Sequence, residues 1–245
     1  ARERGWAGWV AVVAALVLTG LQYGGLSSEY LTVARALYAV GATGTATGLV
    51  AWMRMGPDAG FHHVLYWALA CLLLFGAVPL AVVTLGFRAP LRAFGLARPR
   101  LVDAKPYLLL VACVLPLVFW FSADPAFLDI YPFYQPLHDE PLWPRFWLFE
   151  LAYAGQFCCL ELFFRGFLLH GLRPRMGYGA VFAAMMPYCM LHFGKPLPET
   201  LGAIVAGLVL GHLSLKGRSV WWGVATHVTV AMSMDAAALF RKGLL

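Results

Sequence analysis

The sequence predicts an all-α protein, a polytopic bundle of about eight transmembrane helices, on two observations. First, 61% of the 245 residues are hydrophobic and only 12% are charged, whereas a soluble domain is about half apolar and one quarter charged. Second, the mean hydropathy is +0.73, and the apolar residues gather in long runs. A soluble protein of this size has too large a surface relative to its volume to bury so many apolar residues in its core. Composition therefore excludes a soluble enzyme, a disordered protein and a nucleic-acid-binding module.

Eight apolar runs approach the roughly 20 residues that a helix needs to cross a bilayer. The second run is the weakest, because it is rich in Gly, Ala and Thr and carries Arg35; small-residue stretches of this kind pack closely against a neighbouring helix. We expect scaffold helices over 1–122, an extramembrane loop over 123–145 and core helices over 146–245. In order along the chain, the runs cover residues 6–26, 31–53, 61–87, 106–122, 146–170, 178–193, 197–216 and 219–240.

The two longest loops differ in charge. Residues 88–105 carry four arginines and one lysine against a single acid, whereas residues 123–145 carry four acids against one arginine. Cytoplasmic loops are enriched in Lys and Arg, so we expect 88–105 inside and 123–145 outside, with both termini outside if eight runs cross. Nine Lys and Arg residues then fall inside and seven outside. The basic residues act as topology signals, and no nucleic-acid partner is expected.

Ionisable side chains inside the predicted spans are the strongest functional signal, because each costs about 2.5–3.5 kcal/mol on insertion scales. All but one fall in the last four runs, so the first half is interpreted as scaffold and the second half as the place of the chemistry. These residues are Arg35, Glu150, Glu161, Arg165, His192, His212, His227 and Asp235.

Three of these side chains fall at comparable depth. At 1.5 Å per residue and counted from one membrane face, Glu161, His192 and His227 lie roughly 14, 21 and 12 Å deep. Carboxylates and imidazoles handle protons, so the trio predicts a polar active-site cavity in the C-terminal half. Arg165 follows Glu161 by four residues, which places both on one helix face and predicts an ion pair.

Two further carboxylates each admit two interpretations. Asp235 follows His227 by eight residues on the same broad side of the last run; it either orients a catalytic histidine or lies near the outer surface. Glu199, with Lys195, lies at a membrane boundary, either as part of the site or as an interface anchor. Both are counted among the supporting residues of the predicted site.

The stretch Glu161-Leu-Phe-Phe-Arg165-Gly-Phe-Leu-Leu169 resembles the first motif of the CPBP family (CAAX proteases and bacteriocin-processing enzymes). This is a family of intramembrane proteases that includes the type II CAAX prenyl endopeptidases. Tyr188 and His192 match its second motif, an aromatic residue four before a histidine, and His227 matches its last motif. The resemblance covers residues 146–238 well.

Two positions depart from the family pattern. The first motif usually has two adjacent glutamates, the first of which is commonly assigned the catalytic role; Leu160 occupies that position and only Glu161 remains. The last motif usually has Asn four residues after the histidine, where this chain has Ala231. The chain is therefore similar to a variant, single-glutamate branch of the family, and its residue usage resembles that of myxosortase-like sorting proteases.

The resemblance implies an intramembrane endopeptidase, an integral multi-pass protein of the prokaryotic cytoplasmic (inner) membrane. Its expected partners are the lipid bilayer and a membrane-anchored substrate, cleaved near a C-terminal sorting segment or a prenylated or otherwise lipidated segment. Peptide hydrolysis needs an activated water and a stabilised oxyanion. We expect Glu161 to take the water's proton, His192 to help position the water, and His227 to donate to the oxyanion. The expected supporting residues are Arg165, Tyr188, Glu199 and Asp235.

Three alternatives stay open at this point. Glu161, His192 and His227 could instead bind zinc, since two histidines and a carboxylate form a recognised catalytic set; the chain has no HExxH, and a mechanism without metal or other cofactor is favoured. Leu160 and Ala231 favour a catalytically inactive relative that binds membrane peptides, for example as an immunity protein. Charges at the bilayer midplane also occur in transporters, but paired short helices interrupted by Gly or Pro are missing from the predicted spans.

Overall fold

The computed structural model describes residues 2–54, 58–136 and 141–244. Over these residues the regular structure is helical and no β-strand occurs, apart from an isolated antiparallel bridge between Leu96 and Ser219. The predicted fold class, an all-α polytopic bundle, is confirmed. Helices labelled α are α-helices, and those labelled η are short 3-10 or π segments, several of which continue an α-helix without a break.

The helices have the following bounds. In the first half they are α1 (Arg2–Gly20), η1 (Leu21–Gly25), η2 (Ser27–Glu29), α2 (Tyr30–Ala39), α3 (Thr43–Arg54), α4 (Ala59–Cys71), η3 (Leu72–Ala77), α5 (Val78–Ala81), η4 (Val82–Gly86), η5 (Leu91–Phe94), η6 (Leu101–Asp103) and α6 (Ala104–Phe121). In the second half they are α7 (Pro125–Leu128), α8 (Arg145–Glu161), η7 (Leu162–Leu168), α9 (Leu169–Met176), α10 (Gly179–Met190), α11 (Leu197–Gly217) and α12 (Trp221–Lys242).

Six helical segments among the described residues are long and apolar enough to cross a membrane, and the apolar α10 is shorter. The protein is therefore an integral membrane protein, with fewer full-length spans than the eight predicted. The six segments are Gly5–Gly25, Ala59–Gly86, Leu101–Phe121, Arg145–Met176, Leu197–Gly217 and Trp221–Lys242.

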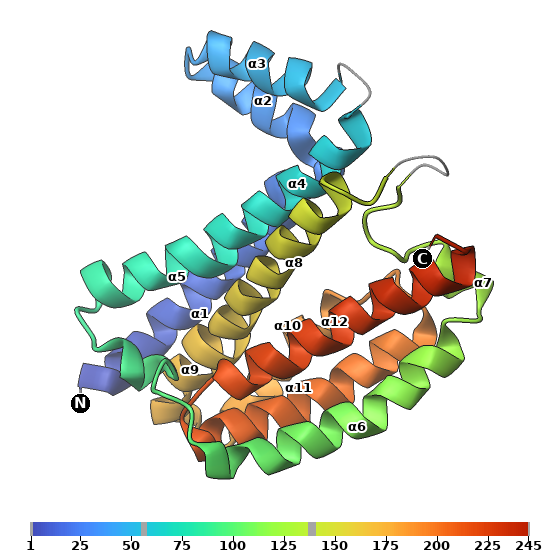
Figure 1. Cartoon of the computed structure of the whole chain (residues 1–245). Helices are drawn as coiled ribbons and strands as arrows, with labels where there is room; N and C mark the ends of the chain where they lie inside the picture. The colour runs from blue at the N-terminus through green and yellow to red at the C-terminus, as the bar shows by residue number, and fades with distance from the viewer. Residues whose placement is uncertain (1, 55–57, 137–140, 245) are drawn as a thin grey trace.

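The predicted span over 31–53 is wrong. This stretch forms a hairpin of α2 and α3, which have 10 and 12 residues and are too short to cross roughly 30 Å of hydrocarbon. The chain turns at Gly41, whose φ of +83° is a backbone conformation that glycine adopts at little cost. In Figure 1 the hairpin stands apart from the main bundle, beyond the ends of α1 and α4.

The loss of one predicted crossing changes the topology. The N-terminus, the α5–α6 connection and the α9–α10 turn lie at one end of the bundle (Figure 1). The α2–α3 hairpin, the connection around α7 and the C-terminus lie at the other end. The two termini are therefore at opposite ends, whereas the count of eight crossings had placed both outside.

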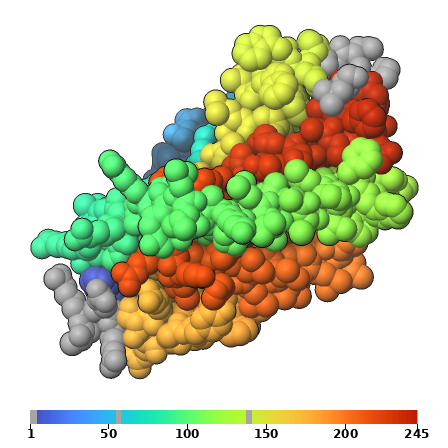
Figure 2. Space-filling model, turned by 60° about the horizontal axis from the view of Figure 1, so that its bottom comes forward, coloured from blue at the N-terminus to red at the C-terminus, as the bar shows by residue number. Residues whose placement is uncertain are grey.

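The second half of the chain surrounds the predicted site. On the face in Figure 2, α6 lies across the bundle between α11 and α12. Within the bundle, Gly207 allows α11 to approach α10 closely, since a Cβ at this position would lie 2.7 Å from Cγ of Met185. This tight contact fixes α10, which carries Tyr188 and ends just before His192.

An aromatic core supports the segment that follows Glu161. Phe163, Phe164 and Phe167 of η7 are fully buried. The Phe163 ring stacks on Phe75 of η3, with 4.9 Å between centroids, and the Phe167 ring stacks on Phe94, at 6.1 Å. The segment η7 is a π-helical turn, a distortion that is frequent at functional sites. Packing from the first half of the chain thus holds the turn that carries Arg165.

Candidate active site

A buried carboxylate forms the centre of the site. Glu161 is the last residue of α8 and is 0% exposed. Its Oε1 atom lies 3.1 Å from Nη1 of Arg165 and 2.9 Å from Nδ1 of His227. The ion pair that the four-residue spacing predicts is therefore present, and it gives the buried arginine the opposite charge that a bilayer interior requires.

His227, in the second turn of α12, is the partly exposed partner of this carboxylate. Its side chain is 13% exposed, and its ring stacks on Phe157 with centroids 4.7 Å apart. Because Nδ1 faces a carboxylate, we assign the proton to Nδ1, which donates to Glu161 and leaves a lone pair on Nε2. A carboxylate that holds one imidazole nitrogen in this way orients the other as a base.

Tyr188 links the remaining parts of the cluster. Its hydroxyl oxygen lies 3.3 Å from Nε2 of His227, and its ring lies 4.0 Å below the guanidinium carbon of Arg165. This cation–π contact is a second source of compensation for the buried arginine. Tyr188 is itself buried, so its hydroxyl is directed into the cluster.

His192 joins the cluster through Tyr188 and not through Glu161. It lies in the turn after α10, where its Nδ1 is 3.0 Å from the backbone oxygen of Tyr188 and its ring is 4.9 Å from the Tyr188 ring. The hydroxyl of Thr200 donates to the His192 carbonyl at 2.8 Å and holds this turn against α11. The Nδ1 contact leaves Nε2 of His192 as its accepting nitrogen.

Gly223, which none of the sequence motifs includes, allows α12 to approach the carboxylate. A Cβ at this position would lie 2.6 Å from Oε2 of Glu161. Gly223 precedes His227 by four residues, so both lie on the same face of α12. That spacing is visible in the sequence and is the signal by which this residue could have been found.

The other two predicted carboxylates lie near the loop before α8, away from His227. Asp235 is 1% exposed and accepts the backbone N–H of Phe133 at 3.1 Å. Of the two interpretations left open for Asp235, the structure favours a position near one end of the bundle, toward the C-terminal end of α12. Asp235 therefore holds the loop, and in the part of the chain that the structure describes no contact joins it to His227.

Glu199 also holds this loop. The hydroxyl of Tyr131 donates to Glu199 at 2.9 Å, and Nζ of Lys195 contacts both Glu199, at 2.6 Å, and the Tyr131 oxygen, at 3.0 Å. Burial, followed by the neighbouring Tyr153 and Glu199, raises the pKa of Tyr131 well above its usual value of 10, so the phenol keeps its proton and remains a donor.

A column of rings connects the loop to the site. Phe133 stacks on Tyr153 at 5.4 Å, Tyr153 lies 4.6 Å from Phe157, and Phe157 stacks on His227. The region between the loop and His227 is thus filled by aromatic side chains.

The donors expected for zinc are not arranged as a metal site. Over the part of the chain that the structure describes, no three His, Cys, Asp or Glu side chains are grouped so that they could hold a metal ion. In the proposed set, Nδ1 of His227 faces Glu161 and Nδ1 of His192 faces a backbone carbonyl. Nε2 of each histidine can still bind a ligand, so what speaks against the zinc alternative is that the described donors are not grouped around one point.

A charged histidine–carboxylate cluster inside a membrane helix bundle is the arrangement expected of an intramembrane endopeptidase. Residues 141–233 match the family described as Rce1-like, type II CAAX prenyl endopeptidase, so this part of the chain is similar to that family. The matched range includes all five residues of the cluster, which are Glu161, Arg165, Tyr188, His192 and His227. The comparisons with curated proteins and with solved structures each found no match.

Proposed function

We propose that this protein hydrolyses a peptide bond in a membrane-tethered substrate that carries a C-terminal prenylated, otherwise lipidated or sorting segment. The observation that supports this most is the 2.9 Å contact between Oε1 of Glu161 and Nδ1 of His227. It couples a fully buried carboxylate to a partly exposed imidazole, as hydrolytic sites do to activate a nucleophile.

In the proposed mechanism, Nε2 of His227 takes the proton of the attacking water. The water oxygen bonds to the scissile carbonyl carbon, and the same proton then passes to the leaving amine as the peptide bond breaks. Glu161 orients the imidazole and stabilises the imidazolium that forms. This differs from the expectation that Glu161 itself is the base, because Oε2 of Glu161 is buried against Gly223 while His227 is partly exposed.

Tyr188, His192 and Arg165 have separate roles in the proposed mechanism. In the structure the Tyr188 hydroxyl donates to Nε2 of His227; once the water takes that place beside Nε2, the hydroxyl is the group placed to donate to the developing oxyanion, in the role first expected of His227. Nε2 of His192 can accept a hydrogen bond from the water and so position it. Arg165 touches neither water nor substrate in this scheme; it keeps Glu161 ionised within the membrane.

A catalytically inactive relative that binds membrane peptides is the second candidate. Leu160 and Ala231 favour it, since both are buried among apolar side chains at positions where the resemblance to the CPBP family implies polar groups. Cleavage distinguishes the two candidates.

The experiment is a cleavage assay with the purified protein in liposomes. Farnesylated CAAX peptides and bilayer-anchored peptides with a C-terminal sorting segment are offered, and products are identified by mass spectrometry. We expect a defined cut that persists in the presence of EDTA or phenanthroline. A wild-type protein that cleaves no peptide supports the inactive relative; inhibition by chelator that zinc reverses would contradict the metal-free mechanism.

Gly223→Ala is expected to lower kcat about a hundredfold, the typical effect of displacing a catalytic group by roughly 1 Å. The added methyl group would collide with Oε2 of Glu161. Gly202→Ala is the matched control, since it lies in α11 with no atom within 4 Å of the added Cβ. Equal kcat values for the two variants would show that the close approach of α12 has no part in catalysis.

Tyr188→Phe is expected to lower kcat by roughly 10²-fold, as loss of one oxyanion donor does. The ring remains, so the contact with Arg165 and the thermal stability should be retained. Steady-state cleavage and thermal unfolding of the same preparation check both statements. A variant with wild-type kcat would remove the hydroxyl from the mechanism.

We also infer the orientation of the protein. Among residues 5–54, 58–136 and 141–244, the end with the α5–α6 connection carries nine basic residues against one acid, and the opposite end carries six against five. The positive-inside rule places the first end in the cytoplasm. The basic residues there are Arg88, Arg92, Arg98, Arg100, Lys105, Arg173, Arg175, Lys216 and Arg218, with the acid Asp103; the other end has Arg35, Arg54, Arg145, Lys195, Arg241 and Lys242 with Glu29, Asp58, Asp124, Asp129 and Glu199.

A further inference from the structure

The α2–α3 hairpin has an unusual composition for a surface element. Between residues 30 and 54 the only charged side chains are Arg35 and Arg54. Large apolar side chains are exposed on it, including Tyr38 at 63% and Val40 at 79%. An apolar surface of this kind is unfavourable in water, and the hairpin begins just beyond the end of the first membrane span. It therefore fits the interfacial layer of the bilayer, where apolar helices lie parallel to the surface.

A groove of about 510 Å³ runs between the two helices of the hairpin. This volume is within the range of pockets that hold small molecules, roughly 300–1,000 Å³. The groove is almost entirely apolar, with Leu31, Ala34, Val50 and Ala51 among its lining residues. It is thus large and apolar enough to hold part of an acyl chain.

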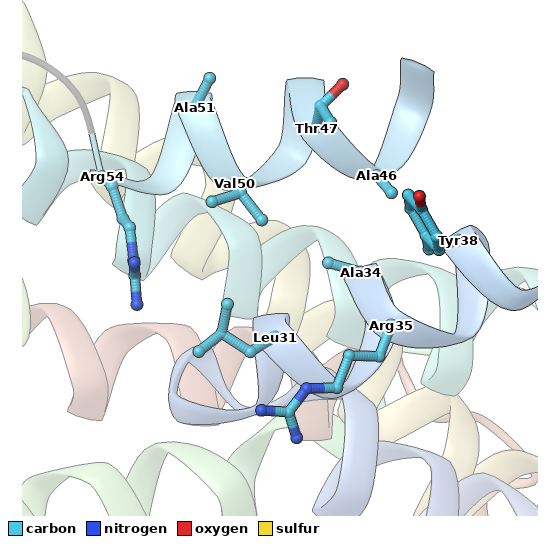
Figure 3. Close-up of a pocket in the computed structure, with 9 residues that line it drawn as sticks. All are labelled: Leu31, Ala34, Arg35, Tyr38, Ala46, Thr47, Val50, Ala51 and Arg54. Carbon is cyan, nitrogen blue, oxygen red and sulfur yellow. The ribbon is translucent and has the colours of Figure 1, made fainter. Parts of the chain in front are cut away.

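Both arginines of the hairpin line this groove. In Figure 3 their guanidinium groups reach from opposite helices toward the same side of it, the side on which Leu31 lies. No acidic residue lines the groove, and within the described ranges neither arginine forms an ion pair with a carboxylate. Two guanidinium groups beside an apolar surface in the interfacial layer carry uncompensated positive charge. Binding of an anion would compensate this charge.

Contacts with Tyr30 fix the position of the Arg54 side chain at the groove. Its Nε donates to the hydroxyl of Tyr30 at 2.5 Å, and its guanidinium carbon lies 5.9 Å from the Tyr30 ring centroid. Both contacts leave the terminal amino groups of Arg54 able to bind a ligand. Guanidinium groups bind phosphate oxygens through paired hydrogen bonds.

We propose that this groove binds an anionic phospholipid. The phosphate lies between Arg35 and Arg54, and one acyl chain packs on the apolar floor formed by Leu31, Ala34, Val50 and Ala51. Because two positive charges face a single phosphate, a headgroup with net negative charge binds better than a zwitterionic one. The site is separate from the Glu161–His227 cluster and does not depend on the proposed proteolysis.

Native mass spectrometry of the detergent-purified protein tests this site. Dioleoyl phosphatidylglycerol and dioleoyl phosphatidylcholine are the two probes. The wild type is expected to retain phosphatidylglycerol with at least about tenfold higher affinity than phosphatidylcholine, a difference that removal of a few phosphate contacts can abolish. The double variant Arg35→Gln with Arg54→Gln is expected to lose this preference. The matched control, Arg92→Gln with Arg98→Gln in the exposed loop at the other end of the bundle, is expected to keep it.

A second variant covers the case in which the arginine variant fails to fold. Ala51→Phe fills the groove and keeps both arginines, and it is expected to weaken retention of phosphatidylglycerol by a similar factor. Unchanged lipid preference in the arginine variant, or equal retention of both lipids by the wild type, would overturn the proposal. So would an arginine variant that still binds the lipid but no longer binds the substrate peptide, since the groove would then be a peptide site.

Discussion

Replacing Glu161 with Gln is expected to lower kcat by about 10⁴-fold, the loss seen when the carboxylate of a hydrolytic triad becomes an amide. The amide group cannot act as the anionic acceptor for Nδ1–H of His227, so the imidazole loses the tautomer that leaves Nε2 as a base. The amide oxygen still lies beside the Arg165 guanidinium, and Arg165 keeps its contact with Tyr188, so the variant should remain folded. The measurement is steady-state cleavage together with thermal unfolding.

The control for this variant is Glu199→Gln. It also neutralises a carboxylate, but one that contacts Tyr131 and Lys195 beside the loop before α8. Its kcat is expected to stay within a few-fold of the wild type. A Glu161→Gln variant whose kcat is no lower than that of the control would eliminate the carboxylate from the mechanism.

Replacing Arg165 with Leu is expected to destabilise the protein by about 3–5 kcal/mol, the typical effect of removing one partner of a buried ion pair. Glu161 is 0% exposed, so its charge would be left with His227 as its one remaining polar contact in the described structure. The contact with Tyr188 would be lost as well. A lower unfolding temperature and a lower yield should accompany the loss of cleavage.

A double variant separates charge from packing in this prediction. Glu161→Gln combined with Arg165→Leu removes both buried charges, so it should be more stable than Arg165→Leu alone although it cleaves nothing. If the double variant is as unstable as the single one, the arginine acts through its packing and not through the ion pair.

The sequence was sufficient to predict the membrane class and the ion pair. An excess of apolar residues can only be buried in a bilayer, and a spacing of four residues places Glu161 and Arg165 on one helix face whatever surrounds them. The clustering of ionisable residues after residue 145 likewise indicated the half of the chain that carries the family match.

The span over 31–53 could not be rejected from composition alone. Its 23 residues have the length and apolarity of a span, and only the turn at Gly41 divides them into two helices. Glycine also occurs inside transmembrane helices, so a glycine in the sequence does not by itself predict a turn.

Roles within the site depend on side-chain directions that a sequence pattern does not contain. The side-chain conformation of His227 decides that Nδ1, and not Nε2, faces Glu161. The contact between Tyr131 and Glu199 joins residues 68 positions apart, and no periodicity relates them. The assignment of Asp235 had two interpretations for the same reason.

The central claim is that Glu161 and His227 act as one catalytic unit, and a double-mutant cycle in the cleavage assay tests it most directly. The rates of Glu161→Gln, His227→Ala and the variant with both changes are compared with the wild type. Residues that act as a unit show losses that do not add, so the double variant is predicted to be about as slow as the slower single variant. Losses that multiply, with the double variant slower by the product of the two single effects, would contradict the account.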